Sequence, residues 1–240
     1  MKKSKCPIKN YDIRDSEDEF ININPYVPQW PFRNIVYGPS GCGKTNYLLN
    51  LIYDYLAYSK LYVYARMLSE KKYQQLQENF KKMEDKKKCS CSVFSDNEND
   101  IIDVNDLDEK VQNLIVIDDF GNSNDSEFWK KIKNLFTMSR KKNTSIIFIA
   151  HDIKQTPKEI KGSANYVTLF GYPNKHDRTN FLREFPLDIT NDEFKKLYKP
   201  ITENKYNFLL IDKQTDDSDM KYRINFDNEL VQKSFKNKQK

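Results

Sequence analysis

The chain alternates between short runs of branched or aromatic residues and longer stretches in which apolar residues recur at helical spacing. The short runs predict buried strands at residues 33–37, 60–64, 113–117, 144–150 and 166–170. Helical spacing is clearest within residues 69–88 and 128–136, where apolar residues follow one another at intervals of three or four. This alternation of strand and helix indicates a mostly parallel sheet covered by helices on both sides.

The remaining segments set the expected domain boundaries. Residues 1–30 alternate poorly and contain three prolines, so we expect an N-terminal arm that ends at the first strand. The α/β domain then spans residues 31–226, and residues 227–240 form a basic C-terminal tail. Near the end of the domain, residues 205–212 and 221–226 predict two strands joined by a polar turn, which is a terminal β-hairpin.

Three further segments have local signatures. The polar and acidic stretch 95–109 predicts an exposed loop. Pro157 is expected to start a short helix, because proline suits the first turn of a helix. The sequence Thr190-Asn191-Asp192-Glu193 has the spacing of a capping box and predicts the start of a late helix.

Composition limits the class of protein. The chain has 240 residues, enough for one domain with a substantial core, and no apolar run approaches the ~20 residues of a membrane span. We therefore expect a soluble protein without a secretory signal, and four cysteines without framework spacing suit a reducing compartment. The net charge of +5 is too small to require a nucleic-acid partner, although residues 129–142 carry six basic residues and no acidic one.

The glycines point to a phosphate-binding loop. Three of only six glycines fall within residues 38–43, between the strand at 33–37 and an apolar helix at 46–53. The segment reads Gly38, Pro39, Ser40, Gly41, Cys42, Gly43, Lys44 and Thr45. In such a loop the backbone N–H groups surround phosphate oxygens, the lysine reaches the β- and γ-phosphates and the hydroxyl binds Mg²⁺. The sequence therefore predicts an ATP and Mg²⁺ site, with Cys42 as a small filler and a chance Gly-rich turn as the alternative.

A pair of carboxylates extends this site. Asp118 and Asp119 end the buried strand at 113–117, which in a parallel sheet is the edge where the phosphate loop lies. Asp118 would then complete the Mg²⁺ shell, and Asp119 would orient and deprotonate the attacking water. The alternative is a strand that simply runs into an Asp-rich turn.

The full set of motifs over residues 30–226 resembles the viral DNA-packaging ATPases of the FtsK–HerA division, especially the poxvirus-type enzymes of large DNA viruses, virophages and Maverick-like elements. The segments that carry the resemblance are Pro31-Phe32, GPSGCGKT at 38–45, the strand 60–64 with Ser69–Tyr73, Asp118-Asp119-Phe120, Ser139–Asn143 and Gln155–Lys161. The resemblance implies a three-layer P-loop NTPase fold of the RecA/FtsK type, with a mostly parallel central sheet.

The resemblance also implies roles for residues around the strand at 144–150. In the family, an arginine just before this strand acts on the nucleotide of a neighbouring subunit, and this arginine corresponds to Arg140. The alternative is that Arg140 is simply the first of three exposed basic residues. The family most often has glutamine at the strand's end, where this chain has His151, with Gln155 four residues later. Either could sense the γ-phosphate, and His151 could instead be a helix-cap or core histidine. Two further departures are Lys161, an arginine in the family, and Asp119, a glutamate in many relatives.

The function expected from the resemblance is a Mg²⁺-dependent ATPase motor that moves double-stranded DNA into preformed capsids. Its expected partners are double-stranded DNA, the capsid or procapsid vertex, and further copies of itself in a pentameric or hexameric ring, without a membrane. It would act in the host cytoplasm or a viral factory, or be associated with the virion. Lysines within 81–88 and in the tail are candidates for DNA contact. The alternatives are another DNA translocase or helicase-like ATPase, a P-loop nucleotide kinase, for which no Arg-rich lid is visible, and a scaffold that binds nucleotide without turnover.

Overall fold

The fold is built on one eight-stranded sheet. The computed structural model describes residues 24–87, 90–171 and 175–226, so most of the expected arm and the whole tail lie outside it. The strand order is β3-β2-β4-β5-β1-β6-β7-β8. The strands are β1 (Arg33–Tyr37), β2 (Lys60–Ala65), β3 (Ser92–Ser95), β4 (Asn113–Asp118), β5 (Thr144–Ala150), β6 (Tyr166–Phe170), β7 (Phe208–Asp212) and β8 (Tyr222–Ile224).

The six strands β1–β6 are parallel, and the last two are antiparallel. Tyr37 at the end of β1 is level with Ala150 at the end of β5, so the carboxyl ends of these strands meet at one edge. β7 pairs antiparallel with β6 and β8 pairs antiparallel with β7. The mostly parallel sheet with a terminal hairpin is therefore confirmed, although a short helix occupies part of the expected turn.

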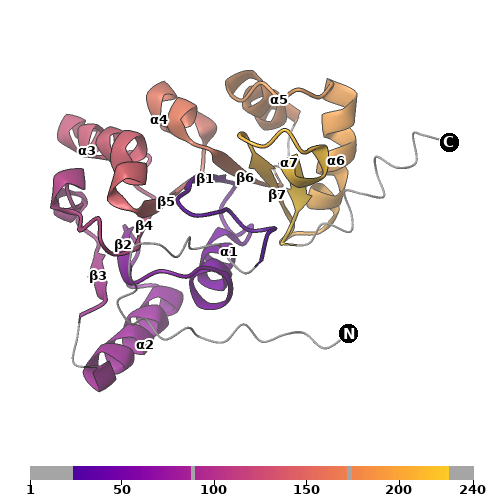
Figure 1. The fold of residues 1–240 in the computed structure, drawn as a ribbon. Helices are drawn as coiled ribbons and strands as arrows, with labels where there is room; N and C mark the ends of the chain where they lie inside the picture. The colour runs from indigo at the N-terminus through magenta and orange to yellow at the C-terminus, as the bar shows by residue number, and fades with distance from the viewer. Residues whose placement is uncertain (1–23, 88–89, 172–174, 227–240) are drawn as a thin grey trace.

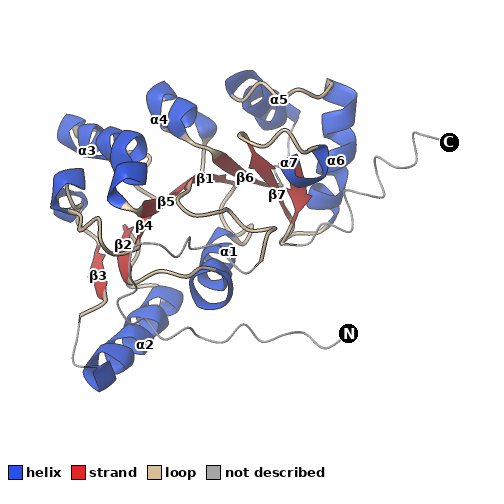
Figure 2. Ribbon diagram, in the orientation of Figure 1, coloured by secondary structure: helices blue, strands red, loops and turns tan. Residues whose placement is uncertain are grey.

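Helices cover both faces of the sheet, as Figure 2 shows by the single layer of strands between them. In Figure 1, α3 and α4 lie on one side, and α1 and α2 lie on the other. The helices are α1 (Lys44–Asn50), α2 (Lys71–Lys87), α3 (Ser126–Met138), α4 (Lys158–Ser163), α5 (Lys175–Glu184), α6 (Asn191–Glu203) and α7 (Ser218–Lys221). α1 continues into a π-helical turn, and four short 3₁₀ turns are Glu98–Asp100, Val104–Asp106, Ser139–Lys142 and Ile153–Gln155. Among the described residues, no helix combines the length and apolar character that crossing a membrane requires.

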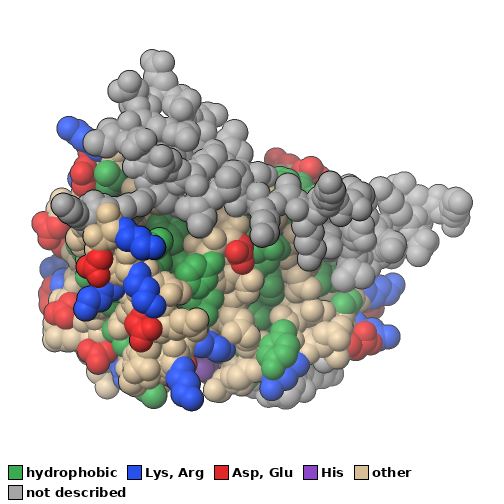
Figure 3. Space-filling view, turned by 90° about the horizontal axis from the view of Figure 1, so that it is seen from below, with side chains coloured by type: hydrophobic (Ala, Val, Ile, Leu, Met, Phe, Trp, Pro, Cys, Tyr) green, Lys and Arg blue, Asp and Glu red, His purple; other side chains and the backbone are tan. Residues whose placement is uncertain are grey.

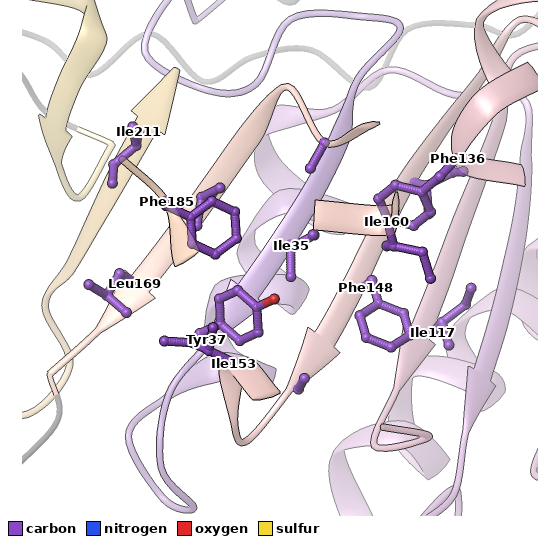
Figure 4. Close-up of a cluster of buried hydrophobic side chains, with 14 of the residues drawn as sticks. Ile35, Tyr37, Ile117, Phe136, Phe148, Ile153, Ile160, Leu169, Phe185 and Ile211 are labelled. Carbon is purple, nitrogen blue, oxygen red and sulfur yellow. The ribbon is translucent and has the colours of Figure 1, made fainter. Parts of the chain in front are cut away.

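Alternate residues of each central strand enter two separate cores, because successive side chains of a strand point to opposite faces. On β1, Ile35 and Tyr37 join the core beneath α3–α6, whereas Val36 joins the core beneath α1 and α2. Figure 4 shows part of the first core, where Phe148 of β5 lies near Ile160 of α4. Burial on both faces explains why the central strands read as continuous apolar runs.

The segment 95–109 was expected to be an exposed loop, and this prediction is wrong in part. Ile101, Val104 and Leu107 are buried in the core beneath α3. The two 3₁₀ turns in this segment keep the acidic side chains outward and turn an apolar residue inward at intervals of three. The edge strand β3 precedes it and was not expected from the sequence.

The start of α6 is fixed by side-chain hydrogen bonds to its first backbone N–H groups. Thr190 accepts a hydrogen bond from the backbone N–H of Glu193, and Glu193 accepts one from the backbone N–H of Thr190. The predicted capping box therefore starts α6. Figure 3 views the described surface from below, where basic and acidic side chains are interspersed over the left part of the face and again at its right margin.

Candidate functional site

The loop of residues 38–45 leaves the carboxyl end of β1, between β5 and β6. Gly38 touches β6 so closely that an added Cβ would lie 2.6 Å from Phe170 Cβ, and Gly43 has φ of +109°. Both positions therefore require glycine, the first for lack of space and the second for its backbone angle. The loop leads directly into α1. The first backbone N–H groups of a helix point out of its N-terminal end, here toward the loop, and no side chain caps them.

Lys44 is held inside this loop. Its Nζ donates to the carbonyl oxygens of Gly38 at 2.7 Å and Pro39 at 2.9 Å, and it lies 3.2 Å from His151 Nδ1. Burial lowers the pKa of Lys44, while the nearby Asp118 and Asp119 carboxylates oppose this shift. The ammonium is thus fixed at the loop, where a phosphate oxygen would meet it.

Asp118 lies at the end of β4 and receives a hydrogen bond from Tyr73 of α2 through the tyrosine hydroxyl and Oδ2. Burial raises the pKa of Asp118 to about 6, and the Tyr73 hydrogen bond and Lys44 oppose the rise. The pKa of Tyr73 is raised well above its usual value, chiefly by burial and then by Asp118. Tyr73 therefore fixes one oxygen of Asp118, a contact that sequence analysis did not predict.

Asp119 and His151 face each other from the ends of neighbouring strands. Asp119 has φ of +63°, an unusual angle for a residue other than glycine, and its Oδ1 lies 3.3 Å from His151 Nε2. Because Nδ1 of His151 faces the ammonium of Lys44, Nδ1 accepts and the ring proton belongs on Nε2. His151 thus bridges Lys44 and Asp119, which is neither a core position nor a helix cap.

Gln155 lies in the same loop region but has different partners. Its Nε2 donates to Asn122 Oδ1 at 2.6 Å, and its Oε1 accepts from the backbone N–H of Asp152 at 3.3 Å. Gln155 therefore completes the capping box of the 3₁₀ turn at 153–155 and packs against Gly121. In this arrangement it stabilises the loop after β5, whereas His151 contacts the lysine of the phosphate loop.

Arg140 lies at the opposite edge of the sheet. It is exposed in the 3₁₀ turn Ser139–Lys142, which immediately precedes the amino end of β5. Lys161, the other departure from the family pattern, pairs with Glu184 at 2.6 Å and is buried between α4 and α5. The structure therefore brings together Lys44, Asp118, Asp119 and His151, and separates Arg140 from them.

An exposed tyrosine adjoins the phosphate loop. A Cβ on Gly43 would lie 3.0 Å from Tyr206 Cδ1, so this ring packs against the loop, yet Tyr206 is 62% exposed. Lys205 Nζ lies 5.5 Å from the ring centroid. Sequence analysis placed both residues in a strand that actually begins at Phe208. The sequence offered only an aromatic residue beside a turn as a signal, and this did not reveal the contact with Gly43, 163 positions earlier.

Two oxygen donors at the site are of the kind that could hold Mg²⁺. Among the residues that the structure describes, no three His, Cys, Asp or Glu side chains form a group that could hold a metal. Thr45 and Asp118 supply a hydroxyl and a carboxylate oxygen, and Mg²⁺ is typically bound by one or two such groups together with substrate phosphates. Cys42 is buried in the loop, and burial raises the pKa of its thiol, in keeping with a filler role.

Fold and site together define a P-loop nucleotide-hydrolysing domain. Two solved structures similar to it are the DNA-packaging ATPase B204 of Sulfolobus turreted icosahedral virus, at 12% identity and TM-score 0.54, and the genome-packaging NTPase B204 of Sulfolobus turreted icosahedral virus 2 with ATP-gammaS, at 11% and 0.50. Each match covers 85% of this chain and 98% of the other. No curated protein sequence matches the chain.

The family follows from the sequence itself. Residues 26–239 match the poxvirus A32 protein family, and the chain therefore belongs to that family. It is a viral genome-packaging ATPase, and its enzymatic activity is the hydrolysis of ATP.

Proposed function

We propose that this ATPase uses Mg²⁺-ATP to move double-stranded DNA into a preformed capsid. The observation that carries the proposal is the meeting of Lys44, Asp118, Asp119 and His151 at the carboxyl edge of β1, β4 and β5. Family membership supports DNA and a capsid as the partners in this proposal. The action would take place in the host cytoplasm or a viral factory, or on the assembling virion.

The phosphate loop would bind the triphosphate through its backbone N–H groups and Lys44. For this the Lys44 ammonium must exchange at least one of its bonds to Gly38 and Pro39 for a phosphate oxygen. Thr45 and Asp118 would hold Mg²⁺, which when bound neutralises charge on the β- and γ-phosphates. Tyr73 would keep the Asp118 carboxylate in its orientation.

Asp119 would orient and deprotonate the attacking water. Its carboxylate is partly exposed, so water can reach it, and His151 Nε2 holds one of its oxygens. His151 also contacts Lys44, so the position of the phosphate-binding ammonium and that of the base are linked through one ring. We assign His151, in preference to Gln155, as the polar residue that responds to the γ-phosphate, because only His151 contacts the loop lysine.

Tyr206 would stack on the nucleobase. Its ring lies beside Gly43, is largely open to solvent and has an ammonium near its face. Aromatic stacking on a base typically contributes about 1–3 kcal/mol. Since every base has a π-face, this contact would add affinity with little selectivity among bases.

Movement of DNA would require a homo-oligomeric ring, pentameric or hexameric, in which Arg140 of one copy reaches the nucleotide of the next. DNA contacts would be made with backbone phosphates, and Lys81, Lys82 and Lys86 are exposed on α2 for this purpose. Such contacts are independent of sequence and weaken with salt by a log–log slope of about −0.9 per phosphate contact.

The test is steady-state ATP hydrolysis by the full chain, with and without double-stranded DNA. We expect turnover that EDTA abolishes and that DNA stimulates without preference for one sequence. Lys44→Ala should lose nucleotide binding, and Asp119→Asn should bind ATP but lose about 10²–10⁴ in rate, as expected when a general base is removed. Asp96→Asn, an exposed acid in another loop, is the matched control and should keep the wild-type rate.

Two results would contradict the proposal. Wild-type turnover by Asp119→Asn would remove that residue from the role of base. Hydrolysis that double-stranded DNA leaves unchanged at low salt, with phosphoryl transfer to an added nucleotide, would identify a kinase instead.

A further inference from the structure

A hollow of about 390 Å³ opens at the edge of the sheet opposite the phosphate loop. It lies between the start of β1, the end of α4 and the residues that follow β7. Its polar lining includes Arg33, Thr137, Asn165, Lys213 and Gln214. None of these residues belongs to the ATP site.

Two cations, Arg33 and Lys213, line this hollow, and neither forms an ion pair with an acidic side chain among the described residues. Burial and the neighbouring Arg140 lower the pKa of Arg33, and burial and Arg33 lower the pKa of Lys213. Arg33 therefore lies close enough to Lys213 for the two charges to repel each other. By contrast, four lysines on α3, α4 and α6 each pair with a glutamate or aspartate: Lys130, Lys133, Lys161 and Lys195.

The two lining cations have structural partners that leave donors free. Arg33 Nη1 donates to the carbonyl of Phe136 at 3.2 Å, near the end of α3. Lys213 Nζ donates to the carbonyls of Lys161 at 3.1 Å and Ala164 at 2.9 Å, at the end of α4. A guanidinium has five N–H groups and an ammonium three, so each side chain keeps donors for a further acceptor.

We propose that this hollow is a second phosphate-binding site, in which Arg33 and Lys213 bind phosphate oxygens. A phosphate fits this arrangement because it offers several strong acceptors and a charge that would relieve the repulsion between the two cations. Asn165 Nδ2, which lies 3.2 Å from Gln214 Oε1, marks a polar wall on the same side. The volume of the hollow lies within the range of small-ligand sites, so a phosphate group has room in it.

The phosphate can come from a nucleotide or from a DNA backbone. Both present the same oxygen chemistry to Arg33 and Lys213. The nucleotide would be one held by a second copy of this chain, which rests on the proposed ring, whereas a backbone phosphate would need only DNA.

The experiment first removes the phosphate site proposed at Lys44. Tripolyphosphate is titrated into the full chain carrying Lys44→Ala, at low salt, by isothermal calorimetry. We expect saturable binding to one site, weakened about tenfold or more by Lys213→Gln, as for loss of one charge-assisted contact. Lys213→Arg should retain most of the affinity, and Lys195→Gln, an exposed lysine on α6, should leave it unchanged. Because hydrolysis is not measured, the result is independent of whether the ATPase proposal holds.

Arg33→Gln should weaken binding as Lys213→Gln does, and thermal melting checks that each variant is folded; if Arg33→Gln is not, the exposed Lys213 carries the test. No saturable binding, or the same loss in Lys195→Gln as in Lys213→Gln, would overturn the proposal. A 20-bp duplex then distinguishes the sources. Displacement of tripolyphosphate by the duplex, with weaker duplex binding in Lys213→Gln, assigns the site to a DNA phosphate. Tripolyphosphate binding that the duplex leaves unchanged assigns it to a nucleotide phosphate.

Discussion

Replacing Arg140 with alanine should stop catalysis while folding and ATP binding remain intact. Arg140 precedes β5, while the phosphate loop leaves β1 where Tyr37 is level with the last residue of β5. The seven residues of β5 at about 3.3 Å each separate the two edges by about 20 Å. No arginine side chain spans that distance, so any contact of Arg140 with a nucleotide must be made in a neighbouring subunit.

The loss of Arg140 should have a large effect on the rate of hydrolysis and a small one on the free energy of unfolding. An arginine supplied from another chain contributes on the order of 10³–10⁵ in rate, or about 4–7 kcal/mol of transition-state stabilisation. Arg140 is exposed and has no hydrogen bond or ion pair with any described residue, so its loss should change the free energy of unfolding by only about 0.5 kcal/mol. Arg140→Ala alone should therefore bind ATP, melt like the wild type and fail to hydrolyse ATP. Lys141→Ala, the exposed neighbour, is the control and should remain active.

A mixing assay tests whether the action is between subunits. Lys44→Ala chains lack a working pocket but keep Arg140, and Arg140→Ala chains have the reverse defect. In an equimolar ring, roughly a quarter of head-to-tail interfaces would join an intact pocket to an intact arginine, so turnover should return to a fraction of the wild-type rate. Full activity of Arg140→Ala alone would refute the reasoning, and so would the absence of recovery in rings shown to contain both chains.

Two further predictions concern single side chains. Tyr206→Ala should raise the KM for ATP about tenfold with kcat nearly unchanged, because stacking contributes to binding. Tyr206→Phe should keep the wild-type KM, because stacking needs no hydroxyl. A fall in kcat alone would contradict this role of Tyr206. Thr190→Ala should lower the free energy of unfolding by about 1 kcal/mol in urea titration, because the cap of α6 is lost. Asn191 makes no capping hydrogen bond with any described residue, so Asn191→Ala should change the free energy of unfolding much less. Equal effects of the two substitutions would contradict the capping role of Thr190.

The elements that the sequence predicted well are those whose signal is local. β5 is buried along all seven residues, so its apolar run could only be a central strand. The phosphate loop is contiguous, and its glycines, lysine and threonine follow a fixed order. Asp118 and Asp119 were expected at the same edge because parallel strands end together, and the structure places them near Lys44.

The features that the sequence did not predict depend on contacts between distant residues. β3 is a four-residue edge strand whose residues are only partly buried, so it lacks an apolar run. Tyr206 lies in a turn, and its contact with Gly43 depends on how β7 pairs beside β6. Arg33 and Lys213 are separated by most of the chain and become neighbours only because β1 and β7 flank β6. Contacts of this kind depend on the order of the strands in the sheet, which the periodicity of apolar residues does not determine.

Three acidic side chains at the carboxyl edge of the sheet and three basic side chains at the amino edge bear on how copies of the chain would associate. Asp118, Asp119 and the nearby Glu70 lie at the carboxyl edge, where a bound triphosphate would add negative charge, whereas Arg33, Arg140 and Lys213 lie at the amino edge. A two-fold dimer through either edge would bring like charges together. A head-to-tail contact instead joins the acidic edge of one copy to the basic edge of the next, and repetition of such a contact closes a ring when the rotation allows. These charges would therefore attract one another in the head-to-tail ring that we propose for the action of Arg140.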